Sequence, residues 1–346
     1  SSSGYSYQYK NMGQTSNKGV ELQLDAVLVD AKDFGLNFNF NISYNRGKID
    51  KLNGSSFWQS SSWAGTAAAG IEDFLVEEGG RLGEVYGYKT DGFYTADDFT
   101  FDTEKGTYAL KSGVNDCSSL IGGKVYPGSI KLKADENGEY KKERLGNTVP
   151  TVSGGFGLNA RWKGFDFTAF FNYSLGNKIV NATKLGSSFY SGSSKNWNIN
   201  DHFTSANRYS WIDPSTGTNL LSSASIKANG EAWTINRLNE VNAGSSIWNP
   251  AAATVMPLVD WAVEDGSFLR VNNITIGYTL PKLLVNKLNI QNIRIYVTGY
   301  NLHCFTKYSG TDPEVDCCTS TPMTPGIDYA AYPKSRSFVG GINVTF

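Results

Sequence analysis

Residues 34–45 read FGLNFNFNISYN, and from Leu36 onward apolar and polar side chains alternate without a break. Successive side chains of a β-strand point to opposite faces, so this segment predicts a strand with one apolar face and one face of asparagine and serine. A second alternating run occupies residues 20–28, and residues 29–33 make a tight connection between the two runs. Together these segments predict a β-hairpin.

The same hairpin pattern recurs along the chain. Residues 152–162 and 165–175 alternate on either side of a Lys163-Gly164 turn, residues 268–280 and 290–302 form a third pair, and a last strand is expected at residues 338–346. These seven strands are about 10 to 14 residues long, close to the length with which a tilted strand crosses a bilayer. The pattern favours a membrane β-barrel, and alternation alone leaves a soluble β-sandwich open as the alternative.

Loop lengths favour the barrel. The connections inside the hairpins are short, whereas the segments 47–151, 177–266 and 304–335 that separate them are long. Membrane barrels have short periplasmic turns at one end and long extracellular loops at the other. We therefore expect an all-β fold, the C-terminal strands of a large antiparallel transmembrane β-barrel with long extracellular loops. Seven strands would leave two unpaired edges in lipid, so residues 1–346 are expected to be part of a larger barrel.

Composition narrows the classes of function. Charged residues make up 18% of the chain, aromatic residues 13%, and 37 residues are glycine, a composition typical of strands and turns. The formal net charge of −1 gives no basic surface for nucleic acid. Four cysteines and two histidines do not show the spacing of a metal site. No Ser/His/Asp set and no phosphate-binding loop is assembled by spacing, so we expect no enzyme, no cofactor and no metal.

Motifs from residue 17 to the end resemble those of one family. They are NKGVEL at 17–22, GYKTDGFY at 87–94, WKGFDF at 162–167, DGSFLRVNNITIGY at 265–278, GYNL at 299–302, FTKYSGTDPE at 305–314 and YPKSRSF at 332–338. In this order they resemble the SusC-like TonB-dependent outer-membrane transporters. The whole chain, residues 1–346, then corresponds to the C-terminal part of a TonB-dependent receptor β-barrel.

The resemblance implies a fold and a set of partners. The family's barrel is of the 22-stranded, plugged type. The plug and the TonB box, through which TonB acts, would belong to an N-terminal region that is not in this chain. A SusD-like surface lipoprotein would assist the import of an oligosaccharide or a peptide. The expected location is the outer membrane of a Gram-negative bacterium, in contact with its lipid, with the loops extracellular and the C-terminus periplasmic.

Two other functions remain open at this point. The SusC-like scaffold could serve as a structural or assembly subunit of an outer-membrane complex. A secreted glycan-binding β protein is the alternative from another class, although the sorting of short and long loops and the terminal strand disfavour it.

The candidate binding residues are tryptophans of the long loops. Flat aromatic faces stack on sugar rings and anchor protein interfaces, and packing inside the loops is the alternative role. The six candidates are Trp58, Trp63, Trp197, Trp211, Trp233 and Trp248.

Three cysteines and one acidic loop are candidates for a disulfide and for a calcium site. A disulfide from Cys304 to Cys317 or Cys318 would staple the last loop in an oxidising compartment, and free thiols are the alternative. Members of the family often carry an acidic, calcium-like loop before the central hairpin. The corresponding residues 134–140, ADENGEY, lack the spaced carboxylates of a calcium loop.

Overall fold

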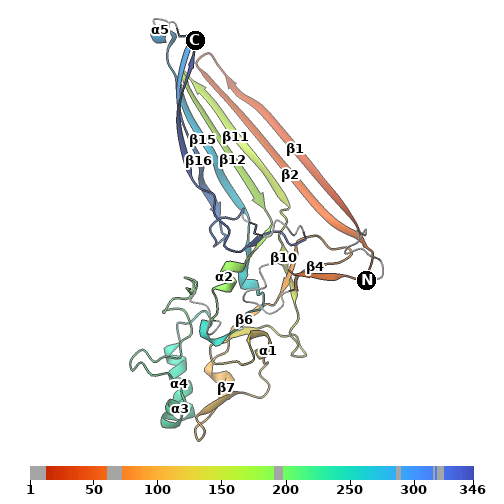
Figure 1. The fold of residues 1–346 in the computed structure, drawn as a ribbon, viewed down its shortest axis with the longest axis vertical. Coiled ribbons are helices and arrows are strands. Elements are labelled where there is room, and N and C mark those ends of the chain that lie inside the picture. Colours follow the sequence, from red (N-terminus) through yellow and green to blue (C-terminus); the bar gives the residue numbers. More distant parts are fainter. Residues whose placement is uncertain (1–12, 61–71, 191–197, 286–289, 315, 318–322) are drawn as a thin grey trace, which may run out of the picture.

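One long antiparallel sheet dominates the computed structural model, and the long loops gather into a separate folded unit at one end of it (Figure 1). The structure describes residues 13–60, 72–190, 198–285, 290–314, 316–317 and 323–346. In spatial order the strands of the sheet are β1 (Gly13–Asp30), β2 (Phe34–Leu52), β11 (Val152–Trp162), β12 (Phe165–Leu175), β15 (Phe268–Thr279), β16 (Asn292–Thr306) and β18 (Ser337–Thr345).

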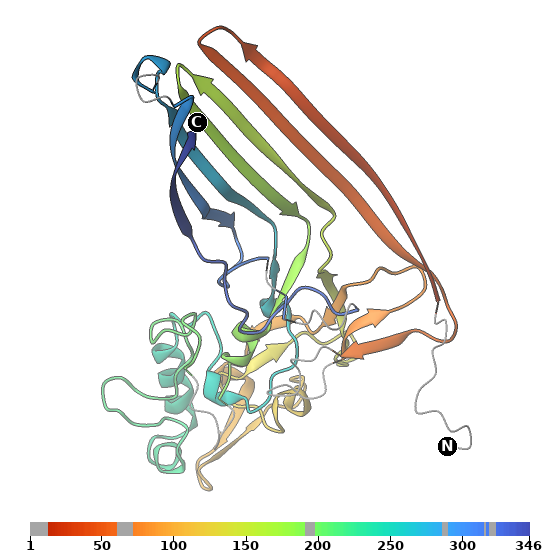
Figure 2. The same cartoon turned by 45° about the horizontal axis from the view of Figure 1, so that its top comes forward.

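The three predicted hairpins and the last strand are therefore confirmed. Each strand of the sheet pairs antiparallel with the strand beside it. One boundary differs: β2 continues to Leu52 and stays paired with β1 as far as Gly13, so the first long loop begins after residue 52 and not at 47. Figure 2 shows the sheet as an open curved wall whose outer strands, β1 and β18, do not meet. The barrel in this chain is partial and is not closed.

One face of the sheet is apolar and exposed. Phe40 on β2 lies between Leu24 on β1 and Phe156 on β11, and the same apolar register continues across the wall to β18. The exposed fractions are 71% for Val20, 56% for Ile276 and 72% for Phe338. A soluble sandwich buries such a face against a second sheet, whereas a membrane barrel presents it to lipid.

Aromatic side chains form a row at the end of the sheet that carries the short turns. Phe34, Trp162, Phe165 and Tyr278 are in register across four strands. The ring centroids of Phe165 and Tyr278 are 4.5 Å apart, and those of Trp162 and Phe165 are 6.2 Å apart. Aromatic girdles at this position are typical of the membrane interface of barrels.

The long loops fold together into one unit with its own core, which we call the loop domain. Buried side chains from the first two loops, including Phe74, Tyr94, Ile226 and Leu238, pack in one cluster with Ile327 of the third. Its strands are β3 (Phe57–Ser60), β4 (Glu72–Val76), β5 (Glu84–Gly87), β6 (Thr90–Phe93), β7 (Phe99–Asp102), β8 (Thr107–Leu110), β9 (Ile130–Leu132), β10 (Glu143–Asn147), β13 (Lys178–Asn181), β14 (Val263–Asp265) and β17 (Ile327–Asp328). Its helices are α1 (Ser118–Ile121), α2 (Ala182–Gly186), α3 (Ser223–Asn229) and α4 (Glu231–Val241), with short 3-10 turns at Ala96–Asp98, Pro250–Ala252 and Asp260–Ala262.

A short helix lies at the opposite end of the sheet, in the turn between β15 and β16. This helix, α5 (Lys282–Val285), lies beside the C-terminus (Figure 1). Within the described residues, none of the helices has the length and hydropathy needed to cross a membrane.

Candidate functional site

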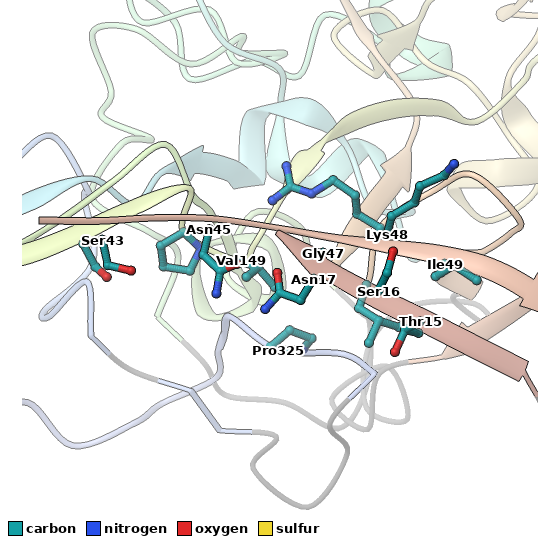
Figure 3. Close-up of a pocket in the computed structure, with 14 residues that line it drawn as sticks. Thr15, Ser16, Asn17, Ser43, Asn45, Gly47, Lys48, Ile49, Val149 and Pro325 are labelled. Atoms are coloured by element: carbon teal, nitrogen blue, oxygen red, sulfur yellow. The ribbon is translucent and has the colours of Figure 1, made fainter. Parts of the chain in front are cut away.

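A polar pocket of about 570 Å³ lies where the sheet meets the loop domain (Figure 3). It opens on the polar face of the sheet, opposite the apolar face, because Ser43 and Ser153 belong to the polar set of β2 and β11. Its lining comes from β1, β2, the start of β11 and two loops. The lining residues are Thr15, Ser16, Asn17, Ser43, Asn45, Gly47, Lys48, Ile49, Arg81, Leu82, Val149, Pro150, Ser153 and Pro325.

Strand register places the two asparagines of the pocket. Asn17 on β1 pairs with Gly47, and Asn45 on β2 pairs with Gly19. Each amide side chain thus has a glycine as its cross-strand neighbour. The space above Gly47 is open, because the atom nearest to an added Cβ would be 3.9 Å away, whereas above Gly19 the Asn45 Oδ1 would lie 3.3 Å from it. The pocket residues were not among the predicted sites, although Ser43 and Asn45 are part of the alternation that predicted the strand. The sequence signal for the pocket is therefore the set of polar residues in the part of the alternating segment that leads into the first loop.

The end of the pocket is fixed by backbone hydrogen bonds. The buried Ile49 donates its amide to the Gly80 carbonyl over 2.9 Å, and Gly79 donates to the Ile49 carbonyl over 2.8 Å. This pairing brings Arg81 and Leu82 to the pocket from the first loop. Neither residue shows a sequence pattern that would place it there.

The lining of the pocket combines hydroxyl, amide and apolar side chains with two cations and contains no carboxylate. Lys48 extends away from Asn17 and Ser43 (Figure 3). Arg81 is the other charged residue of the lining. Hydroxyl and amide groups both donate and accept, so such a surface can bind solutes rich in hydroxyl or peptide groups. It offers no nucleophile with a neighbouring base, which acyl or glycosyl transfer would require.

Charged side chains on the polar face are paired across strands. The Arg294 Nε donates to Asp166 over 2.8 Å, and Arg161 pairs with Asp30. The strand register places Arg161, Asp166 and Arg294 on the polar face. Lipid-facing charges are costly, so this face is the one suited to a lumen.

The described parts of the last loop, residues 307–314, 316–317 and 323–335, return to the polar face, where a buried ion-pair cluster holds the loop. The Arg270 guanidinium, 4% exposed, donates to Asp312 over 2.6 Å and to Glu314 over 2.5 Å. Lys334 also reaches Glu314, over 2.8 Å. Because Pro325 of the same loop lines the pocket, this cluster helps to fix one pocket wall.

A second contact ties the last loop to the loop domain. Ile327 and Asp328 of β17 pair in parallel with β13 of the second loop, and the buried Tyr308 hydroxyl donates to Asp328 over 2.6 Å. Burial, together with this carboxylate, raises the pKa of Tyr308 well above its ordinary value. The hydroxyl therefore keeps its proton and remains a hydrogen-bond donor at any physiological pH.

The chain is similar to several TonB-dependent receptors. It is 29% identical over 352 residues to TonB-dependent receptor P3 of Formosa agariphila, which covers 99% of this chain and 30% of that protein. Identity is 26% to TonB-dependent receptor P39 of the same organism and 23% to TonB-dependent receptor SusC of Bacteroides thetaiotaomicron. The resemblance to SusC-like TonB-dependent receptors is confirmed. No family model matches the chain, which spans about 30% of the length of these relatives.

Solved structures agree on the fold. The chain superposes over its full length on the structure of the RagAB peptide importer in the "closed-closed" state, with a TM-score of 0.59 and 22% identity. For the "open-open" state the TM-score is 0.60 and the identity 22%. The chain covers 31% and 30% of those chains.

The candidate tryptophans that the structure describes occupy different environments, and none of them lines the pocket. Trp248 is buried and donates its indole N–H to the Ser188 carbonyl over 3.1 Å, and Trp211 donates to the Pro127 carbonyl over 2.6 Å. Both therefore pack within the loop domain. Trp58, on β3, lies edge-on to a tyrosine, whereas Trp233, on α4, is 43% exposed. Trp63 and Trp197 lie outside the described residues.

The predicted disulfide stays a prediction. Cys304, on β16, is half-buried and carries a free thiol in the described part of the chain, and Cys317 is exposed. Cys318 lies outside the described residues. Cys117 is buried, and its thiol lies 3.5 Å from the Tyr94 hydroxyl.

In the acidic loop at residues 134–140, the Asp135 carboxylate is bound by groups of the same segment of the chain. Asp135 accepts backbone N–H groups from Asn137 and Glu139 over 2.9 and 3.0 Å and pairs with Lys141 over 2.5 Å. The hydrogen bond from Lys141 holds the pKa of Asp135 below its usual range. No group of three or more His, Cys, Asp or Glu side chains is placed to hold a metal in the part of the chain that the structure describes.

Proposed function

We propose that this chain forms the C-terminal barrel part of an outer-membrane nutrient importer. The observation that carries the proposal is the two-sided sheet, with an exposed apolar face on one side and paired charges and a polar pocket on the other. That distribution suits a wall between lipid and a lumen. TonB would act through a plug and an N-terminal segment of the complete protein, and a SusD-like lipoprotein would assist capture.

We place the loop domain outside the cell. The short turns and the C-terminus share the far end of the sheet (Figure 1), as expected for the periplasmic side of a barrel. The exposed Trp233 then belongs to the surface available to the lipoprotein, because exposed tryptophan is enriched at interfaces. Trp58 is the second described tryptophan that we retain as a candidate for this surface.

An oligosaccharide or a peptide is the proposed substrate. Six of the fourteen lining residues carry a hydroxyl or amide side chain, and either substrate offers complementary groups. The peptide alternative is supported by the solved RagAB peptide importer, and the oligosaccharide alternative by the SusC resemblance alone.

The first test is purification of the native complex from outer membranes in detergent, followed by mass spectrometry of all components. Recovery of a SusD-like lipoprotein together with a plug-bearing sequence is the expected result. Recovery of assembly or secretion components would favour the scaffold alternative. Extraction without detergent would overturn the barrel and favour a secreted protein.

The second test asks whether the pocket lies on the transport path. Ser43→Trp fills the pocket, whereas Ile42→Trp places the same side chain on the apolar face one residue away. Uptake of labelled oligosaccharides and peptides by cells is expected to fall with Ser43→Trp alone, at equal barrel abundance. Equal uptake by both variants would contradict a role of the pocket in import.

A further inference from the structure

A second recess lies on the apolar face, on the other side of the sheet from the pocket. It has a volume of about 570 Å³ and is lined by Phe156, Tyr173, Leu175, Leu269, Phe305 and Lys307, among others. We call it the outer groove. It lies at the loop end of β11, β12, β15 and β16, and nutrient import makes no use of it, because it faces away from the lumen.

A tyrosine folded over a glycine shapes one side of the outer groove. Tyr173 pairs with Gly154 and with Leu269, and its hydroxyl donates to the Asn41 carbonyl over 3.0 Å. A Cβ atom on Gly154 would lie 2.6 Å from the tyrosine hydroxyl oxygen, so only glycine lets the ring lie across the sheet. The tyrosine is therefore held by a hydrogen bond to the backbone of β2.

The opposite side of the outer groove is an exposed aromatic ridge. Phe305 pairs with Leu269 and is 56% exposed. With Leu175 exposed on the far side, the recess lies between two apolar walls on a face that already presents apolar side chains to the surroundings. A ligand in it must itself be apolar, because the walls offer few hydrogen-bonding groups.

The rim of the outer groove toward the loop domain carries charge. Asp265 and Lys307 line it there, and Lys178 is a further neighbour of Asp265. Hydrogen bonds from Ser267, with a smaller effect of the two lysines, hold the pKa of Asp265 below its usual range. Lys307 is the cation of the groove lining, and its ammonium can pair with an anionic group at that level.

We propose that the outer groove binds an acyl chain of lipid A, with a lipid A phosphate at Lys307. The proposal rests on the proposed orientation, in which the loop end of the sheet meets the outer leaflet. A lipid anchored at this depth places its chains against the apolar walls and its phosphates at the rim. Continuity with the lipid-facing surface argues against a protein occupant, because a soluble partner would have to displace lipid to reach it.

The test is native mass spectrometry of the outer-membrane protein that contains this chain, released from detergent with lipid A or phosphatidylethanolamine added. Wild type is expected to retain lipid A. Leu269→Trp, which fills the groove, and Lys307→Glu, which reverses the rim charge, are expected to lower the retained fraction by about fivefold or more. Ile276→Trp changes the same face away from the groove and is expected to leave retention unchanged.

Three outcomes overturn the proposal. Retention of lipid A by all three variants at the wild-type level would show that the groove holds none of it. Equal retention of phosphatidylethanolamine would show a surface without selectivity for phosphate-rich lipid. Loss of retention by Ile276→Trp as well would show a general effect on the lipid-facing surface. Nutrient uptake is measured in parallel, so normal uptake with unchanged lipid retention would disprove the groove and leave the import proposal standing.

Discussion

At the scale of single residues, a glycine makes room for an ion pair that crosses a strand. Gly277 on β15 pairs with Asp166 on β12, and Arg294 on β16 pairs with Thr279, two residues further along β15. A Cβ atom on Gly277 would lie 2.5 Å from the Asp166 Oδ1 and 2.6 Å from the Arg294 Nη2. The two charged groups therefore meet over the glycine, on the face that we assign to the lumen.

Gly277→Ala is expected to displace this ion pair and to lower the stability of the folded barrel by about 1–3 kcal/mol, the usual cost of overpacking. Gly340→Ala is the matched control, because the nearest atom to its Cβ would be 4.0 Å away. The stability of both variants is measured by heating samples and finding the temperature at which the band of the folded protein disappears from a gel. An equal loss in the two variants would contradict the role of Gly277.

Two tryptophans of the loop domain are expected to respond differently to truncation. Trp248→Ala removes a side chain that is 4% exposed and is expected to cost about 3–5 kcal/mol, because it leaves a cavity. Trp233→Ala removes an exposed side chain, and its effect on stability should stay within about 0.5 kcal/mol. If Trp233 contacts the lipoprotein, the second variant loses partner binding in a pull-down while its protease resistance stays normal. Unchanged binding would remove Trp233 from the interface.

At the scale of elements, the last loop depends on a buried arginine. Arg270→Met leaves Asp312 buried without its partner, and breaking a buried pair in this way typically costs about 3–5 kcal/mol. We expect faster amide exchange in residues 307–314 and 323–335 and unchanged exchange in β16 and β18. Lys334→Met, at the exposed end of the cluster, should change exchange little. If the last loop of the Arg270→Met variant still exchanged slowly, the pairing of β17 with β13 would be sufficient to hold the loop without the ion-pair cluster.

The long strands were predictable from the sequence because their signal is local. Alternation over ten or more residues defines a strand and its faces without knowledge of the partner strand. The elements of the loop domain carry no such signal: β17 has two residues and exists because Ile327 pairs with Val180 of another loop. The candidate site divides in the same way. Asn45 follows from the alternation, whereas Arg81 reaches the pocket through pairings that only the folded chain reveals.

At the scale of the whole molecule, the two faces of the sheet should differ in their tolerance of charge. Ile274 belongs to the apolar face at mid-strand, and the adjacent Thr275 points to the polar face, where its hydroxyl lies 2.8 Å from that of Thr298. Lysine on a lipid-facing strand costs about 2–4 kcal/mol at the bilayer midplane. Ile274→Lys is therefore expected to reduce the amount of folded protein in outer membranes more than Thr275→Lys, as measured by the heat-modifiable band and the urea midpoint. A larger loss for Thr275→Lys would reverse the assignment of lipid and lumen on which the transport proposal depends.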